Sequence, residues 1–155
     1  MNEKTKRKRI RRVEGAVVSI DLGDGTHGFG RVLERPLFAF YDLRGERIPP
    51  IEEIIAKPVL FKICVMDHAV TAGTWPVVGS SPLEPSMRES PFFFKQDGPG
   101  RFWRYRSGQE TPASRSEIEG LERAAVWEPI HVVDRLKDHF AGRENIWVKS
   151  LMPQD

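Results

Sequence analysis

Residues 23–31 read GDGTHGFGR, and this stretch decides how the N-terminal half of the chain folds. Its first three glycines match the G-x-G-x-x-G spacing of a dinucleotide-binding loop, but such a loop must open a helix whose N-terminus holds the phosphate. Here FGRVLE follows, with β-branched Val32 and no helix cap, and then Pro36. We therefore interpret Asp24-Gly25 as a hairpin turn between two strands and not as part of a phosphate site.

On the strand after this turn, Gly28 and Gly30 alternate with Phe29 and Arg31. Successive residues of a strand point to opposite faces of the sheet, so both glycines share one face. A face without side chains lets another backbone or a large side chain approach closely. The sequence therefore predicts a packing surface at these two glycines.

Most of the chain before residue 107 predicts strands. Apolar and β-branched runs indicate strands at AVVSIDL (16–22), FGRVLE (29–34), LFAFYDL (37–43) and PVLFKICVM (58–66), and a hairpin joins PFFFKQ (91–96) to RFWRYR (101–106) across DGPG. LFAFYDL is apolar on both alternating faces, which predicts a central strand covered on both sides. Residues 67–91 are punctuated by Gly and Pro and predict a long, partly ordered connection.

Two further segments predict helices. PPIEEIIAK (49–57) is expected to form one short helix, because Pro50 suits the first helical turn. In TPASRSEIEGLERAAV (111–126), Thr111 offers an N-cap, and Ser114 with Glu117 offers a capping box as the alternative. A second helix is therefore predicted over this segment.

The strongest helical pattern is EPIHVVDRLKDHFAG (128–142). Pro129 stands at its start and Gly142 just past its end, and apolar residues recur at helical spacing between them. Strands followed by a helix predict an α+β fold. We expect a mainly antiparallel, strongly bent sheet or partial barrel, with the C-terminal helix packed on it.

Charge is distributed unevenly along the chain. KTKRKRIRR (4–12) holds seven of the 24 basic residues, and Glu3 is the one acidic residue of the 22 that precedes Val13. Residues 13–155 therefore carry 17 basic and 21 acidic side chains, a net charge of −4. We predict a disordered basic tail over residues 1–12 and a single acidic domain over residues 13–155. The tail has no aromatic residue for base stacking, and we expect no nucleic-acid contact except through it.

The sequence also predicts the compartment. No stretch approaches the ~20 apolar residues that a membrane helix needs, and no apolar segment follows the basic N-terminus as in a signal peptide. Cys64 is the single cysteine and lies inside an apolar run, so we expect a buried, inert thiol. These features favour a cytoplasmic protein with no membrane partner.

Motifs for catalysis or metal binding are missing from the sequence. The four histidines, His27, His68, His131 and His139, form neither H-x-H nor H-E-x-x-H, and there is no G-x-S-x-G. We expect no catalytic residue, no metal and no cofactor. RFWRYR mixes arginine and aromatic residues as stacking platforms for nucleic acid do, but the acidic body favours an amphipathic edge strand with its arginines in solvent.

Several fragments, in order, resemble the bacterial immunity protein 26 family: DGTHGFGRVL, PLFAFYDL, PVLFKICVMDHAVTAGTWPVVG, FFFKQD, GLERAAVWEPIHVVDRLKDHFAG and NIWVKSL. The resemblance runs from about Val13 to Leu151. It implies recurring family positions, most of them structural, at Gly25, Gly28, Gly30, Arg31, Phe40, Tyr41, Asp42, Trp75, Glu122, Trp127, His131 and Arg135. Asp21 stands where the family commonly has a proline, which alters the edge of a strand and leaves the fold assignment intact.

The resemblance implies an immunity protein that binds and neutralises a toxin domain of a bacterial polymorphic toxin system. An acidic body suits a basic toxin such as a nuclease. The candidate contact residues are exposed acids and an aromatic residue, namely Asp21, Asp24, Asp42, Glu46, Glu52, Glu53 and Trp75.

Two alternatives stay open at this point. The family name is often joined with a HocA-like phosphotriesterase label, which implies hydrolysis of organophosphate esters. The residues at stake would be Asp67, His68, His131, Asp134 and His139. The second alternative is a nucleic-acid-binding module that uses the basic tail and RFWRYR.

Overall fold

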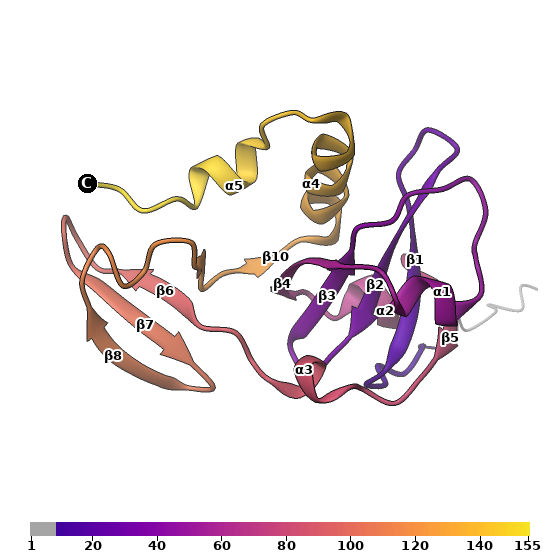
Figure 1. Cartoon of the computed structure of the whole chain (residues 1–155), viewed down its shortest axis with the longest axis horizontal. Helices are drawn as coiled ribbons and strands as arrows, with labels where there is room; N and C mark the ends of the chain where they lie inside the picture. The colour runs from indigo at the N-terminus through magenta and orange to yellow at the C-terminus, as the bar shows by residue number, and fades with distance from the viewer. Residues whose placement is uncertain (1–8) are drawn as a thin grey trace, which may run out of the picture.

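The structure is a computed structural model that describes residues 9–155 (Figure 1). These residues form two mixed sheets, a few short helices and one longer helix near the C-terminus, which confirms the α+β prediction. The predicted tail over residues 1–12 falls largely on residues 1–8, which lie outside the described range. None of the helices in the described range is long and apolar enough to span a membrane.

The first sheet has six strands in the order β10-β4-β3-β2-β1-β5. They are β1 (Ala16–Asp21), β2 (His27–Val32), β3 (Leu37–Tyr41), β4 (Val59–Val65), β5 (Val77–Ser80) and β10 (Val126–Trp127). Neighbouring strands are antiparallel except β10, which pairs parallel with β4. Every residue of β3 is buried, which confirms the prediction of a covered central strand.

The stretch at residues 23–31 forms the hairpin between β1 and β2. Asp21 pairs with His27 across it, and Gly23 and Gly25 in the turn have φ angles of 81° and 85°. The two following glycines form the predicted bare face. A Cβ atom at Gly30 would lie 3.2 Å from the Phe40 ring and from Val18, and one at Gly28 would lie 3.3 Å from Leu136.

Each face of the first sheet is covered by helices. The face that carries Val18 and Phe40 packs against α4 (Pro129–Ala141), with α2 (His68–Thr71) contributing to the same core. The opposite face, which carries Val17 and Tyr41, packs against α1 (Ile51–Ile55) and α3 (Pro85–Arg88). The alternation of side chains along each strand therefore separates two cores.

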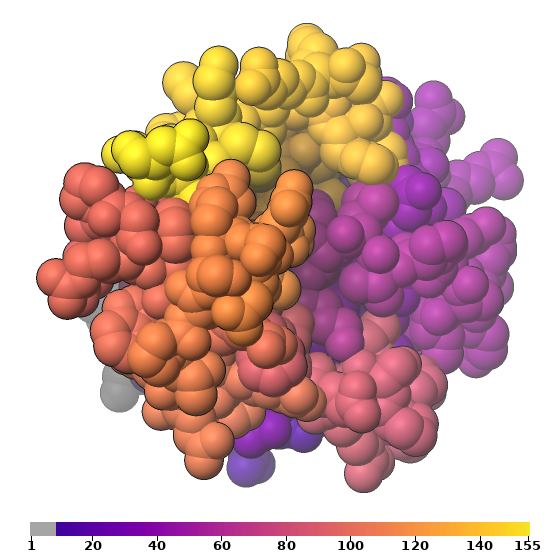
Figure 2. Space-filling view, turned by 60° about the vertical axis from the view of Figure 1, so that its left-hand side comes forward, coloured from indigo at the N-terminus to yellow at the C-terminus, as the bar shows by residue number. Residues whose placement is uncertain are grey.

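The second sheet has four strands in the order β8-β7-β6-β9. They are β6 (Phe93–Gln96), β7 (Phe102–Arg106), β8 (Gln109–Ala113) and β9 (Glu122–Arg123). The hairpin of β6 and β7 confirms the predicted one, whereas β9 pairs parallel with β6. Figure 2 shows this side of the molecule, with the second sheet in salmon and orange and the C-terminal residues in yellow above it. The strands thus form two sheets where one bent sheet was expected.

The predicted helix over residues 111–126 is wrong. Thr111 belongs to β8, and the segment continues through turns into β9 and β10. The capping box itself forms, because the Ser114 amide donates to Glu117 Oε1 (3.0 Å) and the Glu117 amide donates to Ser114 Oγ (3.2 Å). No helix follows, since Gly120 has a φ of 79°, a left-handed conformation that ends helical winding.

The segment over residues 67–91 has more regular structure than the predicted connection. It contains α2, β5 and α3. A further helix, α5 (Ile146–Ser150), follows α4 and was not predicted. Its N-cap is Asn145, whose side-chain oxygen accepts a hydrogen bond from the Val148 amide at 2.9 Å.

The described part of the basic segment contacts the first sheet. Arg12 Nη1 donates to the Leu33 carbonyl (2.7 Å), Nη2 donates to the Leu37 carbonyl (2.8 Å), and Nε lies 3.3 Å from Asp67 Oδ1. The Ile10 amide donates to the Thr71 carbonyl at 3.1 Å. Ordered contacts with the sheet therefore begin before Val13.

Gly30→Ala should lower the free energy of unfolding by about 1–3 kcal/mol, because the added methyl group would overpack the contact with Phe40 and Val18. Urea denaturation of both proteins measures this difference. Gly45→Ala is the matched control, since its Cβ would lie at an ordinary 3.6 Å from the nearest atom. Equal stabilities for Gly30→Ala and wild type would contradict the close packing of this face.

Candidate partner-binding surface

Two acidic segments lie side by side at the end of the first sheet that is farthest from the second sheet (Figure 1). One is the β1–β2 turn, and the other runs from β3 into α1. The His27 amide donates to the Gly45 carbonyl (2.7 Å), and the Gly45 amide donates to the His27 carbonyl (3.1 Å). Arg44 Nη2 also lies 3.1 Å from Asp24 Oδ2. Backbone pairing and an ion pair thus join the two segments where residues 24–27 meet residues 44 and 45.

We call this surface the acidic end and define it by the carboxylates of Asp21, Asp24, Asp42, Glu46, Glu52 and Glu53, all of which are exposed. Residues 21–26 and 42–53 hold these six acids against two basic residues, Arg44 and Arg47. The net charge of these two segments together is −4, which equals the net charge of the whole of residues 13–155. The negative charge predicted from composition is therefore concentrated at one end of the molecule.

Local hydrogen bonds fix the acids of the β1–β2 turn. Asp21 Oδ1 accepts from the Gly23 amide at 2.8 Å. Asp24 Oδ1 accepts from the hydroxyl and from the amide of Thr26. These two hydrogen bonds, with a smaller contribution from Arg44, hold the pKa of Asp24 below its ordinary value. The Asp24 carboxylate therefore stays ionised to a lower pH than an ordinary aspartate does.

The acids of α1 are presented by the packing of its apolar side. Ile54 is buried beneath the helix, and Ile51 packs directly over Gly79 of β5, where any Cβ atom would collide with it. Glu52 and Glu53 occupy the first turn and face outward. Among residues 9–155, neither glutamate forms an ion pair.

Trp75 does not belong to this surface, which corrects its selection as an exposed contact residue. Its relative exposure is 2%, and its ring makes edge-on contacts with Phe38 and Phe40 at centroid distances of 5.9 and 5.7 Å. A large aromatic side chain in a Gly- and Pro-rich connection gains more from the core than from solvent. The six carboxylates remain as the sequence-predicted members.

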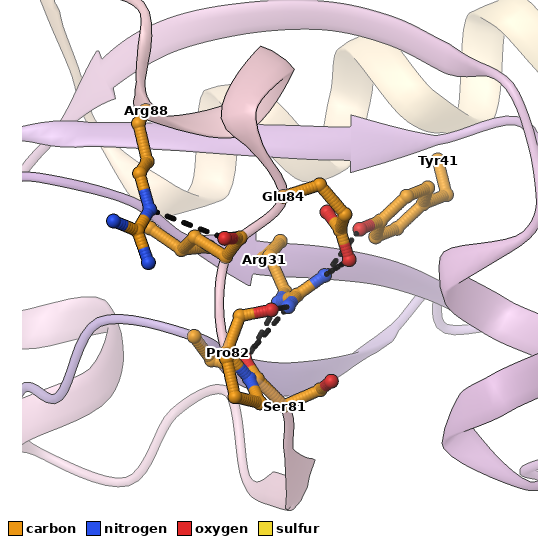
Figure 3. Close-up of polar contacts among 8 residues, drawn as sticks. Arg31, Tyr41, Ser81, Pro82, Glu84 and Arg88 are labelled. Atoms are coloured by element: carbon orange, nitrogen blue, oxygen red, sulfur yellow. Dashed lines mark hydrogen bonds and ion pairs between the residues drawn. The ribbon is translucent and has the colours of Figure 1, made fainter.

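Arg31 lies fully buried on the side of β2 opposite the two bare glycines. Figure 3 shows its guanidinium between Tyr41, Glu84 and the carbonyls of Ser81 and Pro82. Nη2 donates to those carbonyls (2.7 and 3.1 Å), and Nη1 donates to Tyr41 Oη (3.1 Å) and lies 3.5 Å from Glu84 Oε1. This arginine therefore joins β2, β3 and the loop before α3.

A different arginine, Arg135, connects the first sheet to the second. Arg135 of α4 donates from both Nη atoms to the two carboxylate oxygens of Glu122 in β9, each at 2.8 Å. Its guanidinium also lies 3.6 Å from the centre of the Phe61 ring and 5.2 Å from that of Trp127. The structure thus brings together Glu122, Trp127 and Arg135, three positions that the resemblance singled out.

The five residues considered for ester hydrolysis contact other side chains and not one another, and His131 and Asp134 share Trp147. Asp67 binds Arg12 and Arg35, His68 contacts Glu128, His131 stacks on Trp147, Asp134 accepts from Trp147 Nε1, and His139 contacts Asp42. In the part of the chain that the structure describes, no three His, Cys, Asp or Glu side chains are grouped so that they could hold a metal ion. The geometry does not assemble the site that this activity would need.

The arginine-rich strand differs from its expected position. β7 lies between β6 and β8, so the prediction of an edge strand is wrong. Arg104 and Arg106 stack over the Phe92 ring at 4.0 and 4.8 Å from its centre.

The thiol of Cys64 is half-buried, and burial raises its pKa.

A hollow of about 520 Å³, which was not predicted, lies between the second sheet and the C-terminal residues. Phe94, Ile118 and Trp127 are among its lining residues. Arg123, also in the lining, donates to the Leu151 carbonyl (3.0 Å) and to the Met152 carbonyl (3.2 Å). Its guanidinium is therefore occupied in holding the C-terminal segment.

A family model described as Immunity protein 26 matches residues 13–103, which is more than half of the chain. The match includes all six carboxylates of the acidic end and Arg31. It stops before Glu122, Trp127, His131 and Arg135. No curated protein and no solved structure matches the chain.

Arg31→Met should lower the free energy of unfolding by about 3 kcal/mol or more, since each buried acceptor left without its donor costs about 1–3 kcal/mol. Thermal and urea denaturation measure the loss. Arg35→Met is the matched control, because Arg35 is 66% exposed in its ion pair with Asp67 and such pairs contribute at most about 1 kcal/mol. A loss for Arg31→Met no greater than that for Arg35→Met would refute the bridging role.

Proposed function

Because the chain belongs to the immunity protein 26 family, we propose that it neutralises a toxin domain of a bacterial polymorphic toxin system by binding it in a stoichiometric complex. The observation that carries this proposal is the family match over the region that contains the acidic end. Neutralisation of this kind requires a stable surface that occupies the toxin, and it requires no chemistry from the immunity protein itself.

We propose further that the toxin is of the nuclease type. An enzyme that binds nucleic acid carries a basic surface, since phosphate contacts dominate its affinity. The acidic end offers six exposed carboxylates to such a surface, on two segments whose net charge, with Arg44 and Arg47 counted, is −4. Opposite charges across an interface accelerate association and exclude wrong partners.

Hydrolysis of organophosphate esters is not proposed. The residues that it would use are held in five different contacts, among them the stacking of His131 on Trp147 at a centroid distance of 3.7 Å. A general base or metal ligand must instead converge with its partners on one reacting atom. Binding through the acidic end needs no such convergence.

Co-expression with toxin domains encoded by neighbouring genes tests the proposal directly. Each toxin domain is expressed in a heterologous bacterium with and without this protein, and growth and co-purification are recorded. We expect one toxin to be neutralised and to co-purify in a fixed ratio. Failure of every neighbouring toxin in both measurements would overturn the proposal.

Glu52→Lys combined with Glu53→Lys should slow association with that toxin about tenfold at low salt, because it reverses charge where the basic surface docks. Stopped-flow or surface plasmon resonance measures the rate. The matched control is Glu110→Lys with Glu119→Lys, which changes the net charge equally on the side of the second sheet. Equal slowing by both variants would assign the effect to total charge and not to the acidic end.

A further inference from the structure

Ile48 lies inside the acidic end with a relative exposure of 47%. It stands two residues after Glu46 and four before Glu52. Four residues of chain span at most about 14 Å, so the backbone positions of Ile48 and these two glutamates are close enough to fit within one interface, which covers about 800 Å² on each partner. An exposed, large apolar side chain is therefore surrounded in sequence by the carboxylates of the proposed binding surface.

The backbone that carries Ile48 is held on both sides. Upstream, Gly45 exchanges two backbone hydrogen bonds with His27 of β2. Downstream, Ile51 is packed over Gly79 of β5. Ile48 itself precedes Pro49 and Pro50, and a residue before proline has a restricted backbone. The β-branched side chain is also restricted at χ1, so Ile48 loses little conformational entropy when a partner covers it.

We propose that Ile48 is the apolar anchor of the acidic end and that it inserts into an apolar pocket of the toxin domain, at a site rimmed by lysine and arginine. This inference rests on the proposed function and adds the residue that determines the lifetime of the complex. Interfaces concentrate their binding energy in a few buried apolar anchors, while a charged rim sets orientation and association rate.

The negative charge of the acidic end favours a basic partner and disfavours a second copy of this chain. In a two-fold symmetric dimer the same patch meets itself. Two acidic ends with a net charge of −4 each would then face each other, and like charges in contact disfavour association. A surface that presents lysine and arginine around an apolar pocket satisfies both the carboxylates and the isoleucine.

The test uses the purified, catalytically inactive toxin domain that the co-expression experiment selects. Ile48→Ala should weaken its binding about 30-fold, mainly through faster dissociation. Ile48→Asp should weaken it at least as much and should keep the wild-type melting temperature, because the side chain is half-exposed. The matched controls are Ile130→Ala and Ile146→Ala, which remove isoleucines of 68% and 69% exposure from α4 and α5 and should leave the affinity within about twofold.

Each outcome separates the anchor from the proposed function. Affinity of Ile48→Ala within twofold of wild type, for a toxin that wild type does bind, would refute the anchor and leave the immunity role intact. Loss of affinity in Glu52→Lys with Glu53→Lys, but not in Ile48→Ala, would mean that charge alone holds the complex. A change of oligomeric state without a change of toxin affinity would make this face a contact between copies. Binding of no neighbouring toxin by wild type would overturn the proposed function and the anchor with it.

Discussion

The fold depends on the burial of one arginine. Arg31 has no exposed surface, and all three of its guanidinium nitrogens donate hydrogen bonds, one of them from Nε to the Gly15 carbonyl at 2.9 Å. Burying a charge is costly unless its hydrogen bonds and its opposite charge are in place. Glu84 provides that charge, and the carbonyls of residues 15, 81 and 82 provide the acceptors. The chain therefore has to bring β2, β3 and the loop before α3 together at this point.

The burial of Arg31 on one face of β2 also determines that α4 packs against the other face. A slip of one residue in a strand exchanges its two faces. With Arg31 on one face, Gly28 and Gly30 lie on the other, and Leu136 of α4 approaches Gly28 there. With α4 packed on this face, Arg135 forms its ion pair with Glu122 of β9, and this pair connects the second sheet to the helix. At the far end of the helix, His139 Nε2 lies 3.2 Å from Asp42 Oδ1, so the helix also contacts the acidic end.

The sequence predicted those elements whose pattern is local. The first four strands, the hairpin of β6 and β7 and the helix over residues 129–141 follow from alternation and capping, and Gly142 adopts the left-handed conformation expected after a helix. β8 was missed because QETPA is polar and contains Pro112, although Ser107 and Gly108, which form the turn before it, are a dipeptide typical of turns. The six acids were correctly expected at the surface. The contacts that unite them, such as His27 with Gly45, join residues far apart in sequence and have no local pattern.

The placement of Glu52 and Glu53 shows how a charged surface can coexist with a stable fold. Uncompensated like charges repel and destabilise the folded state. Both glutamates, however, stand in the first turn of α1, where the free amide groups of the helix favour negative charge. Their carboxylates therefore need no ion-pair partner to be tolerated, and none of the described residues provides one. The two side chains are therefore free to face a partner, as the proposed binding role requires.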